Sequence, residues 1–465
     1  MLRLPYGISH FPKLVNENYH FIDRTPFLEK LENLPEAYLV FLRPRRFGKS
    51  LWISILHHYY GLEHKHRFGE LFGKYRIGQQ PTPLAGTYHV LRFEFSGIHT
   101  DTPESTRQGF AFNVLSGLRN FEQDYGLTPL DFADNLEASQ LLKQFLDQHK
   151  DKKIYLLIDE YDHFANEILG FQFDHFSDMV SGNGFVRKFY EAIKEATGRG
   201  IIDRMFITGV SPVTLDSLTS GFNIAKHLSL SKIFHPMMGF TEEETREIFQ
   251  GVGCTEDRIE AVMADARKWY NGYRFEPDCP RFYNPDMVLY FANEYSHELK
   301  YPREMLDVNI ASDYGKIRRL FDLRDRQRNH EVLDQLMREG CLYSSLTSQF
   351  SFDKRFTTQD FISLLFYLGL ISIDQDMGNR LRFKIPNYVM EGLYWQFFAE
   401  VLEERSGGGN PNHSPDRLDR QCRQLKKKPV PRPFGERLGE GEKGAILPGF
   451  TLTPTLSLPG RGSLS

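Results

Sequence analysis

The chain has few features that would tie it to a membrane, an oxidising compartment or a nucleic-acid backbone. It has four cysteines in 465 residues and no C-x-x-C pair, which argues against a zinc ribbon or a disulfide framework. No stretch approaches the roughly 18 consecutive apolar residues of a membrane span, and the N-terminus has no signal-peptide core. The formal net charge of −4 gives no global signal for nucleic acid. We therefore expect a soluble, cytoplasmic protein without a membrane partner.

Aromatic residues, in contrast, are abundant. They make up 14% of the chain, with 39 Phe and 22 Tyr, so we expect a Phe-rich core. Hydrophobic residues at 40% and charged residues at 25% are ordinary values for a globular protein. The length is sufficient for more than one domain.

Four short apolar runs predict buried strands, since each is rich in Val, Ile, Phe or Tyr and ends in polar residues or glycine. They span residues 38–42, 89–95, 154–158 and 204–208. Apolar residues at helical spacing lie between them, at 51–59 and 185–193. Strands that alternate with helices predict βαβ crossovers and a mainly parallel sheet. The first domain is therefore expected to be of the α/β class.

The first of these strands runs into the loop Arg43-Pro-Arg-Arg-Phe-Gly-Lys-Ser50, and an apolar helix follows. Gly48 would let backbone N–H groups close on phosphates, and the helix N-terminus adds its positive end. Lys49 would reach the β/γ-phosphate oxygens, and Ser50 would join the shell of a Mg²⁺ ion. The usual pattern has glycine where Arg43 stands, so the alternative is an ordinary basic loop. The strand–loop–helix context favours a P-loop.

A second acidic motif ends the third strand, at Asp159-Glu160. Asp159 would lie at the carboxyl edge of the sheet, where ligands bind in open α/β folds. It suits the metal shell as the Walker-B aspartate, and Glu160 would orient or deprotonate the attacking water. The alternative is a pair that only solvates a strand end. The strand at 89–95 fits between the two motifs, as in P-loop proteins of the ASCE type.

The fourth strand ends in Thr208, whose hydroxyl could sense the γ-phosphate, with Ser211 as a second candidate. Each hydroxyl could equally satisfy the backbone of a local turn. Arg45 and Arg46 are expected to contact phosphates in place of the missing glycine, or to bind an acidic neighbour. Glu160 and Lys49 are the predicted catalytic residues, and Ser50 and Asp159 are the predicted metal ligands. The predicted nucleotide-binding residues are Arg45, Arg46, Phe47, Gly48, Lys49, Ser50, Leu51 and Thr208.

The pattern changes after about residue 235, where amphipathic helices dominate. Thr241–Glu244 is a capping box, and Asn284-Pro285 predicts a helix start. Apolar runs at 370–373 and 381–385 follow a helical segment at 361–367, and they predict a hairpin in the manner of a winged helix. The domains expected are a P-loop ATPase domain at 1–235, a helical, winged-helix-like domain at 236–405, and a disordered tail at 406–465.

The predicted tail is rich in Gly and Pro and has more basic than acidic residues. Such a segment buries too little apolar surface to offset its ordering entropy. It is either a flexible tail or, as we favour, unrelated sequence that replaces a lost C-terminal domain.

Two further groups invite a functional interpretation that the pattern does not favour. His57-His58 and His64-x-His66 have no Cys or carboxylate at ligand spacing that we identify, so we expect ordinary helix-surface histidines. Trp269-Tyr-Asn-Gly-Tyr-Arg-Phe275 is more typical of an aromatic-packed turn than of a base-stacking platform.

These motifs together resemble the AAA-ATPase-like proteins of bacteria and archaea, in which a P-loop ATPase domain usually precedes a PD-(D/E)XK nuclease-like domain. The resemblance covers about residues 4–404 and implies that Arg43 is normal for the group. No spaced Asp…Glu-x-Lys set is found beyond it, so nuclease activity is not carried over. The matching segments are Leu4-Pro-Tyr-Gly-Ile-Ser, Tyr19-His-Phe-Ile-Asp-Arg-Thr25, Phe41–Ser50, Leu157–Asp162, Thr208–Pro212, Trp269–Tyr273, Tyr283-Asn-Pro285 and Ser363–Gly369.

The function expected is binding, and hydrolysis, of ATP with Mg²⁺ to drive a conformational switch. The alternative is a nucleotide-dependent interaction or DNA-associated module with negligible turnover. The partners expected are ATP and, by family analogy alone, DNA. Self-association into a homo-oligomer and the choice between ATP and GTP stay open.

Overall fold

The fold is taken from a computed structural model, which describes residues 2–133, 136–169, 173–218, 222–307, 320–321, 323, 325–347, 350 and 356–407. A five-stranded sheet has the order β2-β3-β4-β1-β5, and all of its strand pairs are parallel. Its strands are β1 (Tyr38–Leu42), β2 (His89–Glu94), β3 (Ile154–Asp159), β4 (Ile202–Gly209) and β5 (Lys226–His227).

The α/β class and the mainly parallel sheet are confirmed, because the four predicted runs form β1 to β4 with small shifts at their ends. The count of four strands was too low. β5 is two exposed residues long and pairs with Leu39 and Val40 of β1, so it carries no apolar pattern of its own. β4 separates β1 from β3, which is the arrangement expected for the ASCE type.

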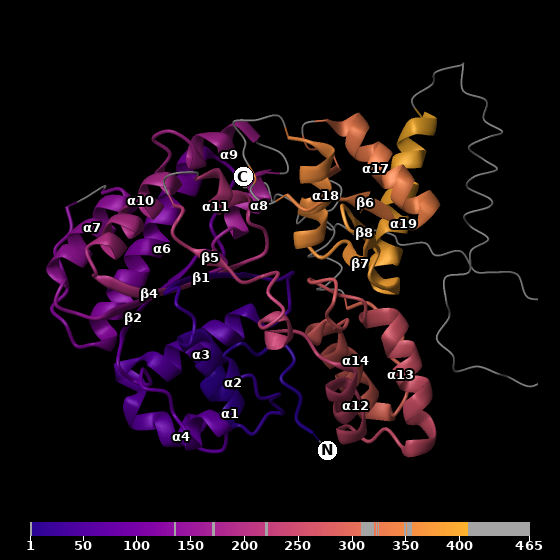
Figure 1. Ribbon diagram of the computed structural model, residues 1–465, viewed down its shortest axis with the longest axis horizontal. Coiled ribbons are helices and arrows are strands. Elements are labelled where there is room, and N and C mark those ends of the chain that lie inside the picture. The colour runs from indigo at the N-terminus through magenta and orange to yellow at the C-terminus, as the bar shows by residue number, and fades with distance from the viewer. Residues whose placement is uncertain are drawn as a thin grey trace, which may run out of the picture. The chain divides into compact units, whose positions relative to one another are not determined.

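Helices cover both faces of this sheet. In Figure 1, α6, α7 and α10 lie on one side of the strands, and α3 lies on the other with α1, α2 and α4. The helices of this part are α1 (Phe11–Asn16), α2 (Pro26–Glu32), α3 (Lys49–Tyr60), the 3-10 helix η1 (Leu62–Arg67), α4 (Phe68–Phe72), α5 (Arg76–Gln79), α6 (Pro103–Asp124), α7 (Ala138–Gln148), α8 (His163–Leu169), α9 (Phe173–Val180), α10 (Phe185–Gly198) and α11 (Val213–Ser217).

Phenylalanines fill the layer between the sheet and α6 and α10, as the composition predicted. Phe95 stacks on Phe110 with 4.6 Å between ring centroids, and Phe189 meets both rings edge-on. α6 approaches β2 closely at Gly117, where a Cβ would lie 2.6 Å from the carbonyl oxygen of Arg92. Such offset and edge-on packing of aromatic rings is favourable in a core.

The second part of the chain is mainly helical. The capping box at Thr241 and the N-cap at Asn284 are both present, at the starts of α12 and α14. Its elements are the 3-10 helix η3 (His235–Met237), α12 (Glu242–Gly251), α13 (Glu256–Tyr270), α14 (Pro285–Glu298), α17 (Arg326–Glu339), β6 (Leu342–Ser344), α18 (Thr358–Tyr367), β7 (Ser372–Asp376), β8 (Leu381–Lys384) and α19 (Tyr388–Gly407).

The predicted hairpin is formed by β7 and β8, which pair antiparallel behind α18. β6 adds a third strand on the other side of β8. The order helix–strand–helix–hairpin, with the first strand paired to the last, is that of a winged helix. The predicted tail lies almost wholly outside the described residues. Among the described helices, none combines the length and apolarity needed to cross a bilayer.

Candidate functional site: a P-loop at the carboxyl edge of the sheet

Three neighbouring strands end where the predicted site residues lie. Leu42, the last residue of β1, pairs with Gly209 of β4. Ile158 of β3 pairs with Ile207 of β4, so Asp159 and Thr208 each follow one position further along adjacent strands. Since the carboxyl ends of parallel strands share one edge, the structure brings the 43–50 loop and both strand-end residues together.

Lys49 is the first residue of α3 and its side chain is buried. Its ammonium donates to the carbonyl oxygens of Arg43 (3.0 Å) and Pro44 (2.9 Å), so it bridges the loop from within. Burial lowers the pKa of Lys49, while the nearby carboxylates of Glu160 and Asp159 oppose that shift. The ammonium therefore lies between the loop and the acidic strand end.

Gly48 caps α3 in the left-handed conformation, with φ of 92°. A residue with a Cβ is strained there, and glycine is not. No described atom lies within 4 Å of where a Cβ would stand, so the backbone at Gly48 is open to a ligand. Ser50 and Leu51 follow in the first turn of α3 and are both half-buried.

Arg43, which stands where the usual pattern has glycine, is an internal anchor. Its guanidinium is buried and donates to the carbonyl oxygens of Leu42 (2.9 Å) and Ser229 (2.7 Å). It also stacks between the rings of Phe41 and Phe275, at 4.2 and 4.1 Å from their centroids. Burial lowers the pKa of Arg43 to about 9, which leaves the group protonated at neutral pH. Its side chain thus holds the loop in place through buried contacts with Ser229 and Phe275.

The side chains of Arg46 and Phe47 also contact the second part of the chain. Arg46 has a left-handed backbone (φ 65°) and pairs with Asp286 of α14 at 2.8 Å. Phe47 is buried edge-on against Tyr273 and Phe275 at 5.1 and 5.7 Å.

Tyr270, Tyr273 and Phe275 are buried, which confirms the expected aromatic-packed turn around residues 269–275. Arg45 is half-buried, and its carbonyl oxygen accepts from Asn284 at 3.5 Å. The alternative expected for the loop arginines was an acidic neighbour, and Arg46 has one in Asp286. Phosphate contacts of Arg45, Arg46 and Phe47 stay predictions.

Asp159 and Thr208 form a buried pair. The Thr208 hydroxyl donates to Asp159 Oδ1 at 2.6 Å, and the Glu160 backbone N–H donates to the same oxygen at 3.0 Å. Both side chains are essentially inaccessible to solvent. The Thr208 hydroxyl is thus engaged in fixing the carboxylate of Asp159, and its expected contact with a γ-phosphate stays a prediction.

Glu160 is held in an uncommon backbone conformation, with φ of 49°. A left-handed non-glycine residue at a strand end often marks a functional position, because the surrounding structure must hold the strain. Burial raises the pKa of Glu160, while His163 and Lys49 oppose the shift. His163 Nδ1 lies 3.4 Å from Glu160 Oε2. Sequence analysis missed His163, although its spacing of three residues from Glu160 was visible.

The turn that carries Glu160 is fixed by Asp162. Its buried carboxylate accepts from the backbone N–H of Val210 (3.0 Å) and of Ser211 (2.7 Å). The Ser211 hydroxyl donates to the side-chain oxygen of Asn166 at 2.9 Å, which is neither a phosphate nor the backbone of a local turn, the two partners expected for it. At Gly209 a Cβ would lie 2.4 Å from Asp162 Oδ1, so glycine is required for this close approach.

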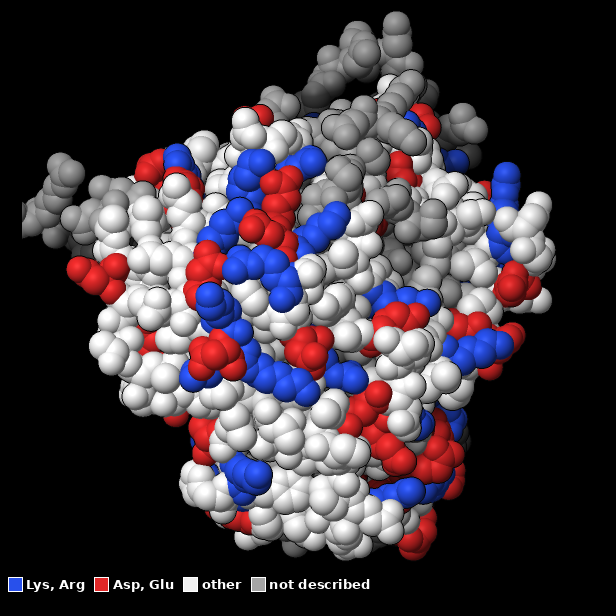
Figure 2. Space-filling view, turned by 60° about the vertical axis from the view of Figure 1, so that its left-hand side comes forward, with Lys and Arg blue, Asp and Glu red and all other residues white. Residues whose placement is uncertain are grey.

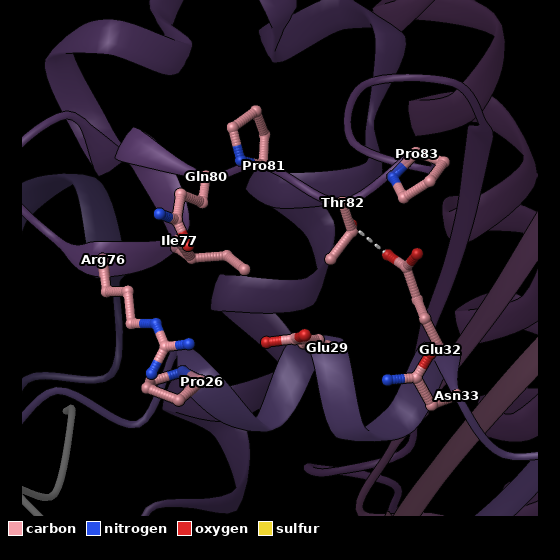
Figure 3. A pocket seen from close by; sticks show the side chains of 10 residues that line it. All are labelled: Pro26, Glu29, Glu32, Asn33, Arg76, Ile77, Gln80, Pro81, Thr82 and Pro83. Atoms are coloured by element: carbon pink, nitrogen blue, oxygen red, sulfur yellow. Dashed lines mark hydrogen bonds between the residues drawn. The ribbon is translucent and has the colours of Figure 1, made fainter.

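A small pocket lies elsewhere, between α2, α5 and the proline-rich loop after α5 (Figure 3). Thr82 donates to Glu32 across its rim. None of the predicted site residues lines it, so it plays no part in the candidate site. Its lining residues are Pro26, Glu29, Glu32, Asn33, Arg76, Ile77, Gln80, Pro81, Thr82 and Pro83.

The sheet order, the glycine–lysine–serine turn at the start of α3 and the acidic end of β3 define the class of this protein as a P-loop NTPase with the ASCE arrangement. Residues 5–219 match the family model described as AAA-ATPase_like, Predicted AAA-ATPase. This part of the chain is therefore similar to the family that the sequence motifs resemble.

A curated relative is described as an uncharacterized protein in the vnfD 5'region of Azotobacter chroococcum mcd 1. It is 25% identical over 410 residues, which cover 83% of this chain and 67% of that protein. Its description assigns no activity, so it adds none here.

Two solved structures are similar in part. The ORC2 protein of Aeropyrum pernix, in ADPNP–ADP complexes, has a TM-score of 0.37 and 10% identity, and the match covers 82% of this chain and 92% of that one. Cdc6p of Pyrobaculum aerophilum has a TM-score of 0.28 and 11% identity over 81% and 92% of the two chains. At these scores the fold assignment rests on the sheet and not on the likeness.

Proposed function

We propose that this protein binds ATP together with Mg²⁺ at the carboxyl edge of the sheet and hydrolyses it to drive a conformational switch. The observation that carries the proposal is the place of Lys49. Its buried ammonium spans the 43–50 loop at the start of α3, and Glu160 and Asp159 act on its charge. A buried lysine that bridges a strand-to-helix loop beside two carboxylates is the arrangement that binds the β/γ-phosphates in P-loop proteins.

Nucleotide binding is assigned to the loop and the start of α3. The backbone N–H groups around Gly48 would close on the phosphates, since the left-handed glycine leaves that side open. Lys49 would exchange its two carbonyl partners for β/γ-phosphate oxygens, which are stronger, charged acceptors. The predicted phosphate contacts of the remaining loop residues and Leu51 belong to the same proposal.

The donor set at this edge fits Mg²⁺, which favours oxygen ligands such as carboxylate and hydroxyl. Asp159 offers a carboxylate oxygen, and its other oxygen is held by Thr208 and by the N–H of Glu160. Ser50 offers a hydroxyl from the first turn of α3. Together these two residues would hold the ion beside the β/γ-phosphates, where its charge offsets that of the transferred phosphoryl group.

Glu160 is proposed to accept the proton of the attacking water. Burial raises its pKa, which increases its basicity, and the adjacent His163 keeps its carboxylate oriented. Asp159 is the last residue of β3, and Glu160 follows it with a left-handed backbone outside the strand. Binding and proton transfer are thereby assigned to neighbouring residues with different roles.

The switch is proposed to run through the contacts between the loop and the second part of the chain. Arg46 pairs with Asp286, and Phe47 packs against Tyr273, so a shift of the loop on binding phosphate changes both contacts. We also propose that the P-loop domain ends at residue 235 and that the helical, winged-helix-like domain begins at residue 236. The cytoplasmic location remains a prediction.

A second candidate is a nucleotide-dependent interaction or DNA-associated module that turns over negligibly. This candidate is supported by the winged-helix order of the second part of the chain, which runs α17, β6, α18, β7 and β8. On the face shown in Figure 2, basic and acidic side chains are interspersed and form no basic stripe of the kind that a phosphate backbone requires.

The test is phosphate release with Mg-ATP by the wild-type chain, Glu160→Gln and the control Glu167→Gln. Glu167 also lies near His163, at 3.8 Å, but one helical turn further along α8 and eight residues after the strand end. We expect Glu160→Gln to retain ATP affinity and lose about 10²–10⁴-fold in turnover, the usual contribution of a general base. The control should keep turnover within about twofold. Equal turnover in all three proteins would refute the hydrolytic role, and a wild-type burst without multiple turnover would favour the second candidate.

A further inference from the structure

Four side chains meet at the far end of α3, away from the P-loop. His57 and His58 lie in the last turn of α3, and Glu63 and His64 follow in η1. One ring nitrogen of each of the three histidines lies within 4.8 Å of the others. At about 1.5 Å per residue, His57 is roughly 12 Å along the helix from Lys49, so this cluster is distinct from the nucleotide site.

The burial of this group corrects the expectation of ordinary helix-surface histidines. The side chain of His58 is buried, and those of His57 and His64 are only 15% and 20% exposed. The rings of His58 and His64 stack at 4.1 Å between centroids, and His57 meets His64 edge-on at 4.8 Å. The fold back from α3 into η1 creates this contact, and helical spacing alone does not reveal it.

His58 is prepared as a neutral ligand. Its Nδ1 lies 2.7 Å from the carbonyl oxygen of Ser54, which fixes the proton on Nδ1 and leaves the lone pair on Nε2. An imidazole whose outer N–H is held by a backbone carbonyl is the usual state of a metal-ligating histidine.

His64 supplies a second nitrogen that could serve as a ligand. Its Nε2 is buried and makes no hydrogen bond to any part of the chain that the structure describes. A buried polar nitrogen without a hydrogen bond is uncommon in a folded protein, and a bound ion would satisfy it.

Glu63 adds negative charge to the cluster. Its Oε1 lies 2.8 Å from His57 Nε2 and 3.5 Å from His64 Nε2, and its other oxygen accepts from the Tyr125 hydroxyl. The contacts with His57 and Tyr125 hold this carboxylate beside the rings. Gly61 makes room for this carboxylate, because a Cβ there would lie 2.6 Å from Oε1.

We propose that His57, His58 and His64, supported by Glu63, bind a divalent transition metal of the zinc class. Three imidazoles and a carboxylate suit Zn²⁺, whereas Mg²⁺ and Ca²⁺ require oxygen-rich sets. Asp124, at the exposed end of α6, lies within the same reach of His57 and Glu63 and is a further oxygen ligand. The ion would tie the end of α3 to η1 and α6, and it takes no part in the nucleotide chemistry.

The competing possibility is that the three histidine rings pack together without an ion. Such packing accounts for the stacked rings but leaves His64 Nε2 without a hydrogen bond, 3.5 Å from the Glu63 carboxylate. The two possibilities differ in one observable, which is stoichiometric binding of Zn²⁺ that depends on these histidines.

The experiment uses the full chain, stripped with a chelator and without nucleotide, titrated calorimetrically with Zn²⁺ and separately with Mg²⁺. The variant is His64→Ala, and the matched control is His66→Ala, an exposed histidine of the same 3-10 helix outside the cluster. We expect the wild type and the control to bind one Zn²⁺ per chain and to gain thermal stability. The variant should lose at least tenfold in affinity and most of that gain.

Circular dichroism of each metal-free protein shows whether a variant is folded. If His64→Ala is unfolded, His57→Ala is used in its place. Substitution with Co²⁺ gives a second readout, since a tetrahedral histidine site produces visible absorption bands that an exposed surface histidine does not. Absence of Zn²⁺ binding at micromolar concentration would overturn the proposal. Equal Zn²⁺ affinity in the wild type and the folded cluster variant would do the same.

Discussion

Asp216 is a buried carboxyl group whose pKa lies far above its ordinary value, and its effect on stability can be worked out in advance. It lies in α11, just after the strand end that carries Thr208, and is 9% exposed. Burial raises its pKa to about 7, although its Oδ2 accepts from the backbone N–H of Phe350 at 3.0 Å. The ordinary value is 3.8.

The sign follows from proton linkage. Between about pH 4 and pH 7 the folded state holds a proton that the unfolded state has released, so the free energy of unfolding falls as pH rises. A shift of about three pH units corresponds to at most about 4 kcal/mol. Between pH 5 and pH 8 the same relation gives a loss of about 2–3 kcal/mol.

Asp216→Asn removes this dependence, because the amide is neutral at both pH values and its oxygen can still accept from Phe350. We expect the variant to gain about 2–3 kcal/mol over the wild type on going from pH 5 to pH 8, measured by denaturant unfolding at each pH. The exposed Asp101→Asn is the control and should show no such change. If the Asp216→Asn difference were the same at both pH values, the buried carboxyl would not be titrating as described.

Three further changes test other parts of the account. Thr208→Val should lower ATP turnover at least tenfold, because it removes the 2.6 Å hydrogen bond that fixes the Asp159 carboxylate. Thr208→Ser keeps a hydroxyl and is the control, so equal turnover in the two variants would contradict this positioning role. Arg43→Lys should lower the free energy of unfolding by roughly 1–3 kcal/mol in denaturant titrations, because an ammonium lacks the planar guanidinium that stacks on Phe275 while donating to both carbonyl oxygens. Truncation after Gly407 should leave the thermal midpoint within about 4 °C of the full chain and ATP binding unchanged; a larger drop would show that the predicted tail packs on the body.

The sequence was sufficient for the parts of the fold that carry periodic or capped patterns. The runs at 38–42 and 154–158 are buried almost from end to end, and their last residues lead into recognisable motifs. The caps at Thr241 and Asn284 were recognisable because a side chain satisfies nearby backbone N–H groups. Local chemistry determined these elements, so one sequence was enough to predict them.

The sequence was not sufficient where contacts join distant segments. β5 is a strand only because Lys226 and His227 lie beside β1. The direction of the Arg43 side chain depends on Ser229 and Phe275, which are far away in the chain. His57 and His58 looked like surface residues because η1 folds back against the end of α3, and helical spacing does not predict that contact.

The central claim is that Lys49 holds the triphosphate, and equilibrium binding of ATP with Mg²⁺ to the wild type and Lys49→Ala tests it most directly. The variant loses a charge-assisted contact worth about 1.5–3 kcal/mol or more, so we predict at least tenfold weaker binding by calorimetry. Lys65→Ala, on the exposed surface of η1, is the control and should bind as the wild type does. Unchanged affinity in a folded Lys49→Ala protein would contradict the assignment of the nucleotide site.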